Sequence, residues 1–236
     1  MLDQSRFFEY WSDIILPAVW ATLRMLSVSM LLGFVIGTAC GIAMVVISPF
    51  GLRPKPRLYK AAGFIINMIR SFPVIILIVA MSPVTKVLVG TSIGEKAAIV
   101  PLTLAAFPVI ARQIEASLLE VNPSVVLAAR SFGASDFHIV FKVLFVEALP
   151  SIISGMTTIT ILFLASTTLA GAVGAGGLGA VALTYGYQRF DDVMMYAIVG
   201  LLFFMVLLIQ GIGELLYRNS KKQFRRIGEK NEIKKC

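Results

Sequence analysis

The sequence predicts an all-α integral membrane protein with five transmembrane helices, and three observations support this fold class. Of the 236 residues, 58% are hydrophobic and only 14% are charged, whereas soluble domains are about half apolar and a quarter charged. Long apolar segments recur along the chain, and the stretch 25–47 contains no charged side chain. A helix needs about 20 mostly apolar residues to cross a bilayer. The third observation is that basic residues concentrate between and after these segments.

Five spans are predicted in chain order. The first contains Gly33, Gly37 and Gly41, whose spacing of four favours close contact with another helix. The third is short and holds Pro101 and Pro108, which spans tolerate where neighbouring groups satisfy the freed carbonyls. The spans lie at about 15–47, 60–83, 97–114, 148–172 and 193–214. The membrane domain is thus 15–214, with an external segment 1–14, a cytoplasmic segment 115–147 and a basic cytoplasmic tail 215–236.

The distribution of Lys and Arg predicts the orientation N-out, C-in. Segment 53–60 holds four basic residues, segment 112–142 holds three, and eight follow residue 217, which makes 15 of the 21. The opposite side would hold five, and the remaining one, Arg70, falls within a span. Cytoplasmic loops carry the excess of Lys and Arg, so these segments are placed in the cytoplasm. The net charge of +8 is then explained at the membrane surface, and no nucleic-acid partner is predicted.

Arg70 is an unusual residue for a predicted span. A central arginine costs at least about 2.5–3.5 kcal/mol when it faces lipid. It therefore faces the bundle interior or a water-filled cavity, or it reaches the interface as an anchor. Both interpretations stay open, and Arg70, Ser71 and Pro73 are candidates for a translocation path.

A glycine-rich segment follows the fourth span on the predicted outer side. Its spacing, G-x-G-x-x-G, matches a dinucleotide-binding motif, but no strand precedes it, so a turn with close helix packing is expected instead. Candidates for an outer gate are Gly174, Gly176, Gly177 and Gly179. Segment 90–97 lacks the spacing and the hydroxyl of a phosphate loop. With a single histidine and no nucleophile–base group, the chain is expected to be no enzyme and to bind no metal or cofactor.

The segment between the third and fourth spans predicts a helical hairpin. Asn122 is a favourable N-cap, and Pro123 suits the first helical turn. That helix would run to about Phe132. Gly133 then suits the position after a helix, where a positive φ is favoured. Ser135 can cap a second helix that leads to the fourth span.

The hairpin resembles the EAA loop of ABC-importer permease subunits. The resemblance rests on Ala128-Ala129, on Gly133 four residues later, and on Val143 and Leu144 before the next span. Leu127 stands where that family usually has glutamate, and Val146 where it usually has proline. The resemblance implies a type I importer permease fold and a coupling helix that sits in a groove of an ATPase. The coupling residues would be Ala128, Ala129, Arg130, Gly133, Ala134 and Ser135.

Much of 58–212 is similar to the permease subunits of methionine importers. The similar stretches are 70–73, 89–94, 98–103, 147–150 and 171–179. The resemblance implies a multi-pass protein of the bacterial inner or plasma membrane that forms a homodimer. Two cytoplasmic subunits would bind ATP and Mg²⁺, and an external lipoprotein would deliver methionine or a related amino acid. Transport would proceed by alternating access at the homodimer axis.

Two rival functions remain open at this stage. One is a secondary transporter driven by an ion gradient, which would require carboxylates within spans. The acidic residues nearest the spans, Glu115, Glu147 and Glu214, are expected near cytoplasmic ends. The other rival is a membrane anchor or assembly factor that transports nothing. Co-purification of an ATPase would separate these functions.

Overall fold

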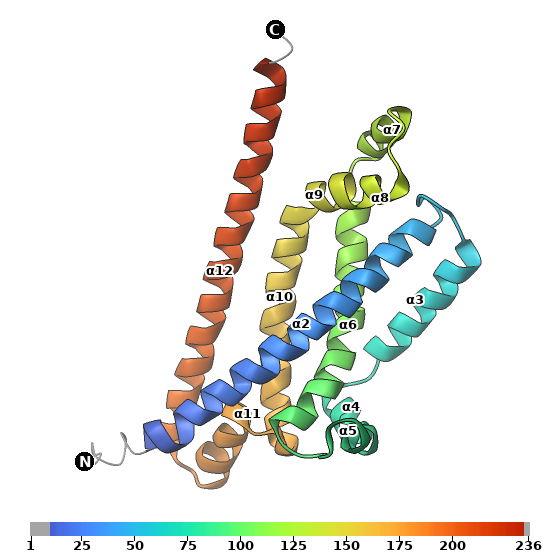
Figure 1. The fold of residues 1–236 in the computed structure, drawn as a ribbon. Coiled ribbons are helices and arrows are strands. Elements are labelled where there is room, and N and C mark those ends of the chain that lie inside the picture. Colours follow the sequence, from blue (N-terminus) through green and yellow to red (C-terminus); the bar gives the residue numbers. More distant parts are fainter. Residues whose placement is uncertain (1–9, 234–236) are drawn as a thin grey trace.

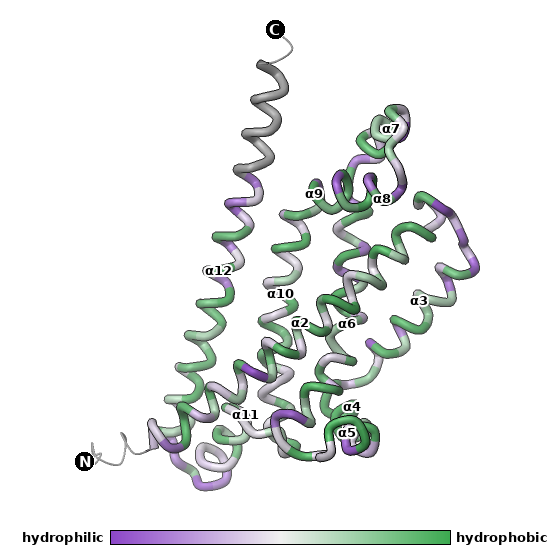
Figure 2. Tube along the Cα trace, viewed as in Figure 1, coloured by the Kyte–Doolittle hydropathy of each residue, from purple (hydrophilic) through white to green (hydrophobic). Residues whose placement is uncertain are grey.

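The computed structural model describes residues 10–233 and the side chains of residues 10–221, and helices and the short loops between them make up this part of the chain. Long helices run between two ends of the molecule (Figure 1). Helices α7–α9 (residues 123–147) and the end of α12 (Asp192–Ile233) lie at one end, and α4 (Val74–Ala80), α5 (Ser82–Val89), α11 (Gly177–Val181) and the first described residues lie at the other. Hydrophilic residues gather mainly at these two ends, with mostly hydrophobic helix between them (Figure 2).

Four described helical segments are long and apolar enough to cross a membrane. They are Trp11–Ile47, Glu95–Leu119, Leu149–Ala175 and Asp192–Lys221. The first joins a wide helical turn, η1 (Trp11–Ile15), to α2 (Leu16–Ile47), and the second is α6 (Glu95–Leu119). The third joins α10 (Leu149–Ala170) to η3 (Gly171–Ala175), and the fourth lies in α12 (Asp192–Ile233). The prediction for residues 1–9 lies outside the described residues.

The second predicted span, 60–83, is not one helix. It contains α3 (Pro56–Arg70) and α4 (Val74–Ala80), bent by 91° relative to each other, and then α5 (Ser82–Val89). Pro73 explains the break, because proline has no N–H to donate and disfavours helix at the residue before it. By length and composition, the described residues therefore offer four candidate spans, or five if the bent pair is counted as one.

The helix at the third predicted span, 97–114, is longer than the predicted range. Helix α6 extends to Leu119 and contains Pro101 and Pro108 without ending at either. Both prolines are buried, as expected where neighbouring helices compensate for the missing hydrogen bonds. Arg112 and Glu115, predicted at or beyond the end of this span, thus lie within its helix.

Helices α2 and α6 form the most extensive helix–helix contact among the described residues. A methyl group on Gly33 would lie 2.8 Å from Ala106 Cβ, and one on Gly37 would lie 2.7 Å from Phe107 O. A methyl group on Gly41 would lie 2.7 Å from Ala111 O. Cβ atoms essentially never approach so closely, so the predicted role of these glycines in close helix contact is confirmed.

The remaining short helices close the two ends of the molecule. After η3, α11 (Gly177–Val181) packs against α2, and η4 (Ala182–Gln188) leads from α11 to α12. There the Thr22 hydroxyl accepts a hydrogen bond of 2.9 Å from Leu178 N. At the opposite end, α7 (Pro123–Ser131), α8 (Asp136–His138), η2 (Ile139–Leu144) and α9 (Phe145–Glu147) form the predicted hairpin.

Replacing Gly37 by alanine is expected to destabilise the protein by about 1–3 kcal/mol, because the added methyl group overpacks the α2–α6 contact. Gly211→Ala in α12 is a matched control, since nothing lies within 4 Å of the place that its methyl group would take. That variant should be neutral, or more stable by up to about 1 kcal/mol through helix propensity. Thermal unfolding in detergent measures both changes, and equal stability of the two variants would contradict the packing argument.

Candidate functional site

The hairpin has the local geometry that its sequence predicts. Asn122 Oδ1 accepts a hydrogen bond of 2.9 Å from Ser124 N, and Ser135 Oγ accepts one of 3.3 Å from His138 N. Gly133 adopts a φ of 76°. Its N–H donates to Arg130 O at 2.9 Å, and Ala134 N donates to Ala129 O at 3.1 Å. This pair of bonds is the Schellman motif, so the corner between the two helices is fixed by backbone geometry.

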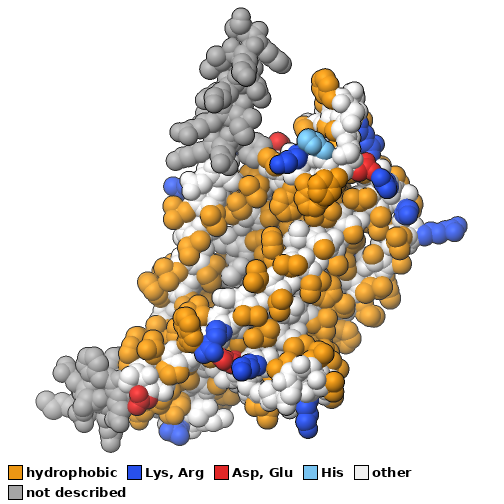
Figure 3. Space-filling model, viewed as in Figure 1, with side chains coloured by type: hydrophobic (Ala, Val, Ile, Leu, Met, Phe, Trp, Pro, Cys, Tyr) orange, Lys and Arg blue, Asp and Glu red, His pale blue; other side chains and the backbone are white. Residues whose placement is uncertain are grey.

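The outer surface of the hairpin is apolar and accessible. None of the nine residues of α7, all of which the structure describes, is buried. The exposed fractions of Leu127, Phe132 and Phe137 are 63%, 92% and 72%. Hydrophobic side chains are visible at this end of the molecule, next to His138 and basic residues (Figure 3). Exposed apolar patches with polar rims mark interaction sites.

The predicted coupling residues divide between this surface and the interior. Ala128, Arg130, Gly133 and Ser135 are exposed, whereas Ala129 and Ala134 are half-buried and pack against the core. Arg130 also donates from Nη2 to Leu52 O at 3.1 Å. The alanine pair thus has one member that can face a partner and one that packs the hairpin onto its own protein.

The predicted path residues lie at the break between α3 and α4. Arg70 is the last residue of α3, and Ser71 donates from Oγ to Asn67 O at 2.9 Å. Arg70, Ser71 and Pro73 are all exposed in the single chain. The break supplies backbone without regular helical bonds at this position, which membrane proteins tolerate where it is buried in protein or lines water.

The glycine segment forms a turn with close packing, as predicted. Gly174, Gly176 and Gly177 have φ values of 94°, 83° and 75°. Gly179 lies directly against the backbone of Thr168, where a side chain would overlap it. Gly174 O accepts a hydrogen bond of 2.9 Å from Gly94 N. The structure thereby brings this turn to the end of the molecule where α4 and α5 lie (Figure 1), opposite the hairpin.

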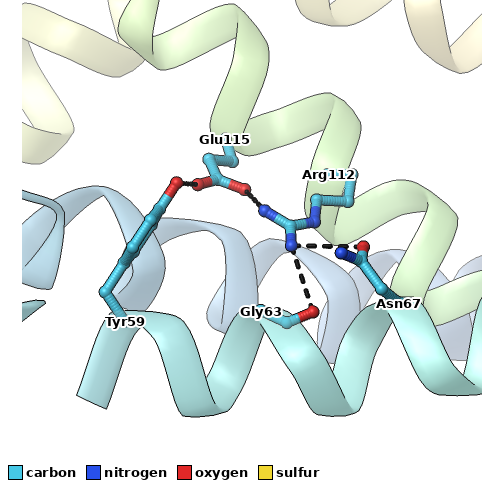
Figure 4. A network of polar contacts seen from close by, with 5 residues as sticks. All are labelled: Tyr59, Gly63, Asn67, Arg112 and Glu115. Carbon is cyan, nitrogen blue, oxygen red and sulfur yellow. Dashed lines mark hydrogen bonds and ion pairs between the residues drawn. The ribbon is translucent and has the colours of Figure 1, made fainter. Parts of the chain in front are cut away.

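A polar network between α3 and α6 was not predicted. Glu115 accepts 2.7 Å hydrogen bonds from Tyr59 OH at Oε1 and from Arg112 Nη1 at Oε2 (Figure 4). Arg112 Nη2 also donates to Gly63 O and to Asn67 Oδ1, each at 3.2 Å. Among the side chains that the structure describes, Glu115 carries the only buried charge, with 4% of its surface exposed. The signal in the sequence was an Arg and a Glu three residues apart.

A polar cavity near the hairpin was also not predicted. It has a volume of about 700 Å³ and lies between α6, α10 and α12. On its wall, Ser117 Oγ and Ser151 Oγ lie 3.0 Å apart, and Ser151 Oγ donates to Glu120 Oε2 at 2.8 Å. Gln113, Asn122, Glu147, Ser154 and Tyr217 also line the cavity. Polar side chains thus line a space at the ends of α6 and α12 and the start of α10, within a mostly apolar bundle.

Comparison with known proteins identifies close relatives. Residues 33–225 match the family described as "Binding-protein-dependent transport system inner membrane component". The probable D-methionine transport system permease protein MetI of Vibrio cholerae is 42% identical over 214 residues, which cover 91% of this chain and 95% of that protein. The D-methionine transport system permease protein MetI of Escherichia coli K12 is 44% identical over 164 residues, 70% of this chain and 73% of that protein.

A solved structure has the same fold. A chain of the MetNI methionine ABC transporter, described as in an inward-facing conformation, matches with a TM-score of 0.87 and 40% identity. The match covers 93% of this chain and 99% of that chain. The agreement therefore extends over nearly the whole length of both proteins.

Replacing Glu115 by alanine is expected to destabilise the protein by about 3 kcal/mol, because Arg112 then loses its carboxylate partner in a mostly buried site. Tyr59→Phe removes a single hydrogen bond, leaves the ion pair in place and should cost about 1 kcal/mol. Thermal unfolding of the purified variants measures the difference. Indistinguishable melting temperatures for the two variants would argue against a central role for the ion pair.

Proposed function

The chain belongs to the family of binding-protein-dependent transport system inner membrane components, and from this membership we propose that it is the permease subunit of an ATP-driven methionine importer. The observation that supports this most directly is the identity of 40–44% to methionine permeases over most of the chain. The permease moves solute and is not an enzyme. ATP and Mg²⁺ would be bound by a separate subunit.

The hairpin supplies the proposed contact with that subunit. Its exposed apolar surface has the composition of a docking site, and its corner is held rigid by the Schellman bonds at Gly133. A rigid hairpin transmits the displacement of a partner better than a flexible loop does. ATP-driven movement of two partner subunits would thereby reach the spans as a rigid-body motion.

Two copies of the chain are proposed to enclose the path. Four or five spans per chain leave many apolar side chains and the residues 70–73 exposed in one copy. A two-fold symmetric dimer would bring equivalent surfaces together around an axis. The polar cavity of about 700 Å³ near the hairpin supports a conformation in which that path opens to the cytoplasm. The likeness to an inward-facing transporter supports the same conformation.

The proposed orientation is N-out, C-in, as the excess of 15 basic residues over five indicates. The hairpin, the cavity opening and the end of α12 then lie on the cytoplasmic side. The turn at 174–179 lies on the outer side, where an external lipoprotein would deliver the substrate. Among the rival functions, ion coupling needs a carboxylate free to bind an ion, whereas Glu115 is occupied by Arg112 and Tyr59.

Deleting this chain from its host should abolish high-affinity uptake of labelled methionine, and restoring it should recover that uptake. The tagged chain, purified in mild detergent, should bring an ATPase with it in a fixed ratio. Methionine uptake that is unaffected by the deletion would reject this substrate. Repeated absence of an ATPase from active preparations would reject the class of transporter.

Replacing Gly133 by valine should lower methionine uptake by about tenfold while the chain still inserts and binds its ATPase. The reason is the positive φ, which costs an ordinary residue about 1–2 kcal/mol and a β-branched residue more. Space is not the cause, since nothing lies within 4 Å of the added Cβ. Gly133→Asn is the matched control, because asparagine tolerates this conformation. Equal uptake by both variants would contradict the proposed role of the corner.

A further inference from the structure

The loop between α2 and α3, residues 48–55, is folded tightly onto the end of α2. Arg53 N donates to Val46 O at 2.9 Å, and Lys55 N donates to Ile47 O at 3.0 Å. Gly51 lies so close to Val45 O that a side chain there would overlap it. These backbone bonds satisfy carbonyl groups that a helix end leaves open. The loop is therefore a rigid extension of α2.

This loop contacts the hairpin on both sides of its glycine corner. Arg130, before Gly133, donates from Nη2 to Leu52 O at 3.1 Å. Asp136, after Gly133, pairs through Oδ2 with Arg53 Nε at 2.6 Å. One polar contact thus reaches each helix of the hairpin, and together they fix the angle of the hairpin relative to α2.

Packing between the loop and α7 is incomplete, which increases the importance of the two polar contacts. An apolar cavity of about 590 Å³ separates them. Phe50 and Leu52 line it from the loop, and Val126, Leu127 and Arg130 line it from α7. Since side chains do not fill this space, the Arg130–Leu52 and Arg53–Asp136 contacts connect the two parts.

The C-terminal end of loop 48–55 leads into α3, which ends at the candidate path residues 70–73. Helix α3 begins at Pro56 and is held to α6 by the Arg112–Glu115 network. Its 15 residues extend for about 22 Å and end at Arg70, beside the break. Helix α3 thus connects the loop to residues 70–73, so a displacement of the loop would reach these residues through α3.

We propose that loop 48–55 is a second transmission arm of the transporter, in which Arg53 and Asp136 are positioning residues that link the hairpin to α2 and α3. This inference rests on the proposed function and deepens it. The hairpin is continuous with α6 on one side and α10 on the other, and this covalent path provides one connection from the proposed ATPase to the spans. The loop provides the other, to α2 and α3.

The test is a charge exchange in the complete transporter, reconstituted in liposomes with its ATPase and binding protein. Arg53→Asp places two carboxylates together, and Asp136→Arg places two cations together. Each variant should lower the number of methionine molecules transported per ATP by about threefold to fivefold, the effect that one exposed ion pair permits. The double exchange, Arg53→Asp with Asp136→Arg, should restore most of this ratio.

Lys55→Asp is the matched control, because Lys55 is an exposed cation on the same loop for which no ion pair is present among the described side chains. Its transport ratio should equal that of the wild type. A ratio that stays unchanged in both single variants, or is not restored by the exchange, overturns the transmission arm. The wild-type complex separates the two hypotheses, because its failure to couple ATP hydrolysis to methionine uptake would overturn the proposed function itself.

A second measurement uses the purified chain without partners. Hydrogen exchange of the α7 amides should become faster in Arg53→Asp and Asp136→Arg and return toward the wild-type rate in the double exchange. Unchanged protection of α7 in the single variants would show that the ion pair does not position the hairpin. That result would also overturn the proposal.

Discussion

The close contact between α2 and α6 is the interaction on which the rest of the structure depends. Within a bilayer the hydrophobic effect contributes little to helix association, so close packing and interhelical hydrogen bonds must stabilise the contact between helices. Gly33, Gly37 and Gly41 let the two backbones approach to distances that no side chain would permit. Helices α3, α10 and α11 pack against this pair, and α12 in turn packs against α10. Helix α3 is joined to α6 by Arg112 and Glu115, and the turn after α10 returns to Thr22 of α2.

The α2–α6 pair also determines the position of the hairpin. Helix α6 ends at Leu119, three residues before the cap at Asn122, and α2 ends at Ile47, where the loop 48–55 begins. Both helices of the central pair therefore reach the hairpin, one through the chain and the other through hydrogen bonds. A force on the hairpin acts on a unit whose members cannot slide past one another, which favours rigid-body movement over local deformation.

Features that depend on a few neighbouring residues could be predicted from the sequence. The caps at Asn122 and Ser135 and the positive φ at Gly133 follow from local chemistry, and all three are present. Pro73 signals the break at residues 71–73, but the long apolar run around it predicts an unbroken span. The bonds from Glu115 to Tyr59 and from Arg130 to Leu52 join residues more than 50 positions apart. No local pattern specifies such pairs, because they depend on how the helices pack.

The departure at Leu127 can now be interpreted in physical terms. Leu127 is 63% exposed on the outer side of α7 and borders the apolar cavity next to the loop. A glutamate there would place a charge beside this apolar surface, whereas leucine extends that surface. The shape of the hairpin does not depend on residue 127, because the caps, the Schellman bonds and the Arg53–Asp136 pair define it. If the hairpin docks on an ATPase as proposed, we therefore expect apolar contact at this position, with the charged interactions confined to the chain's own loop.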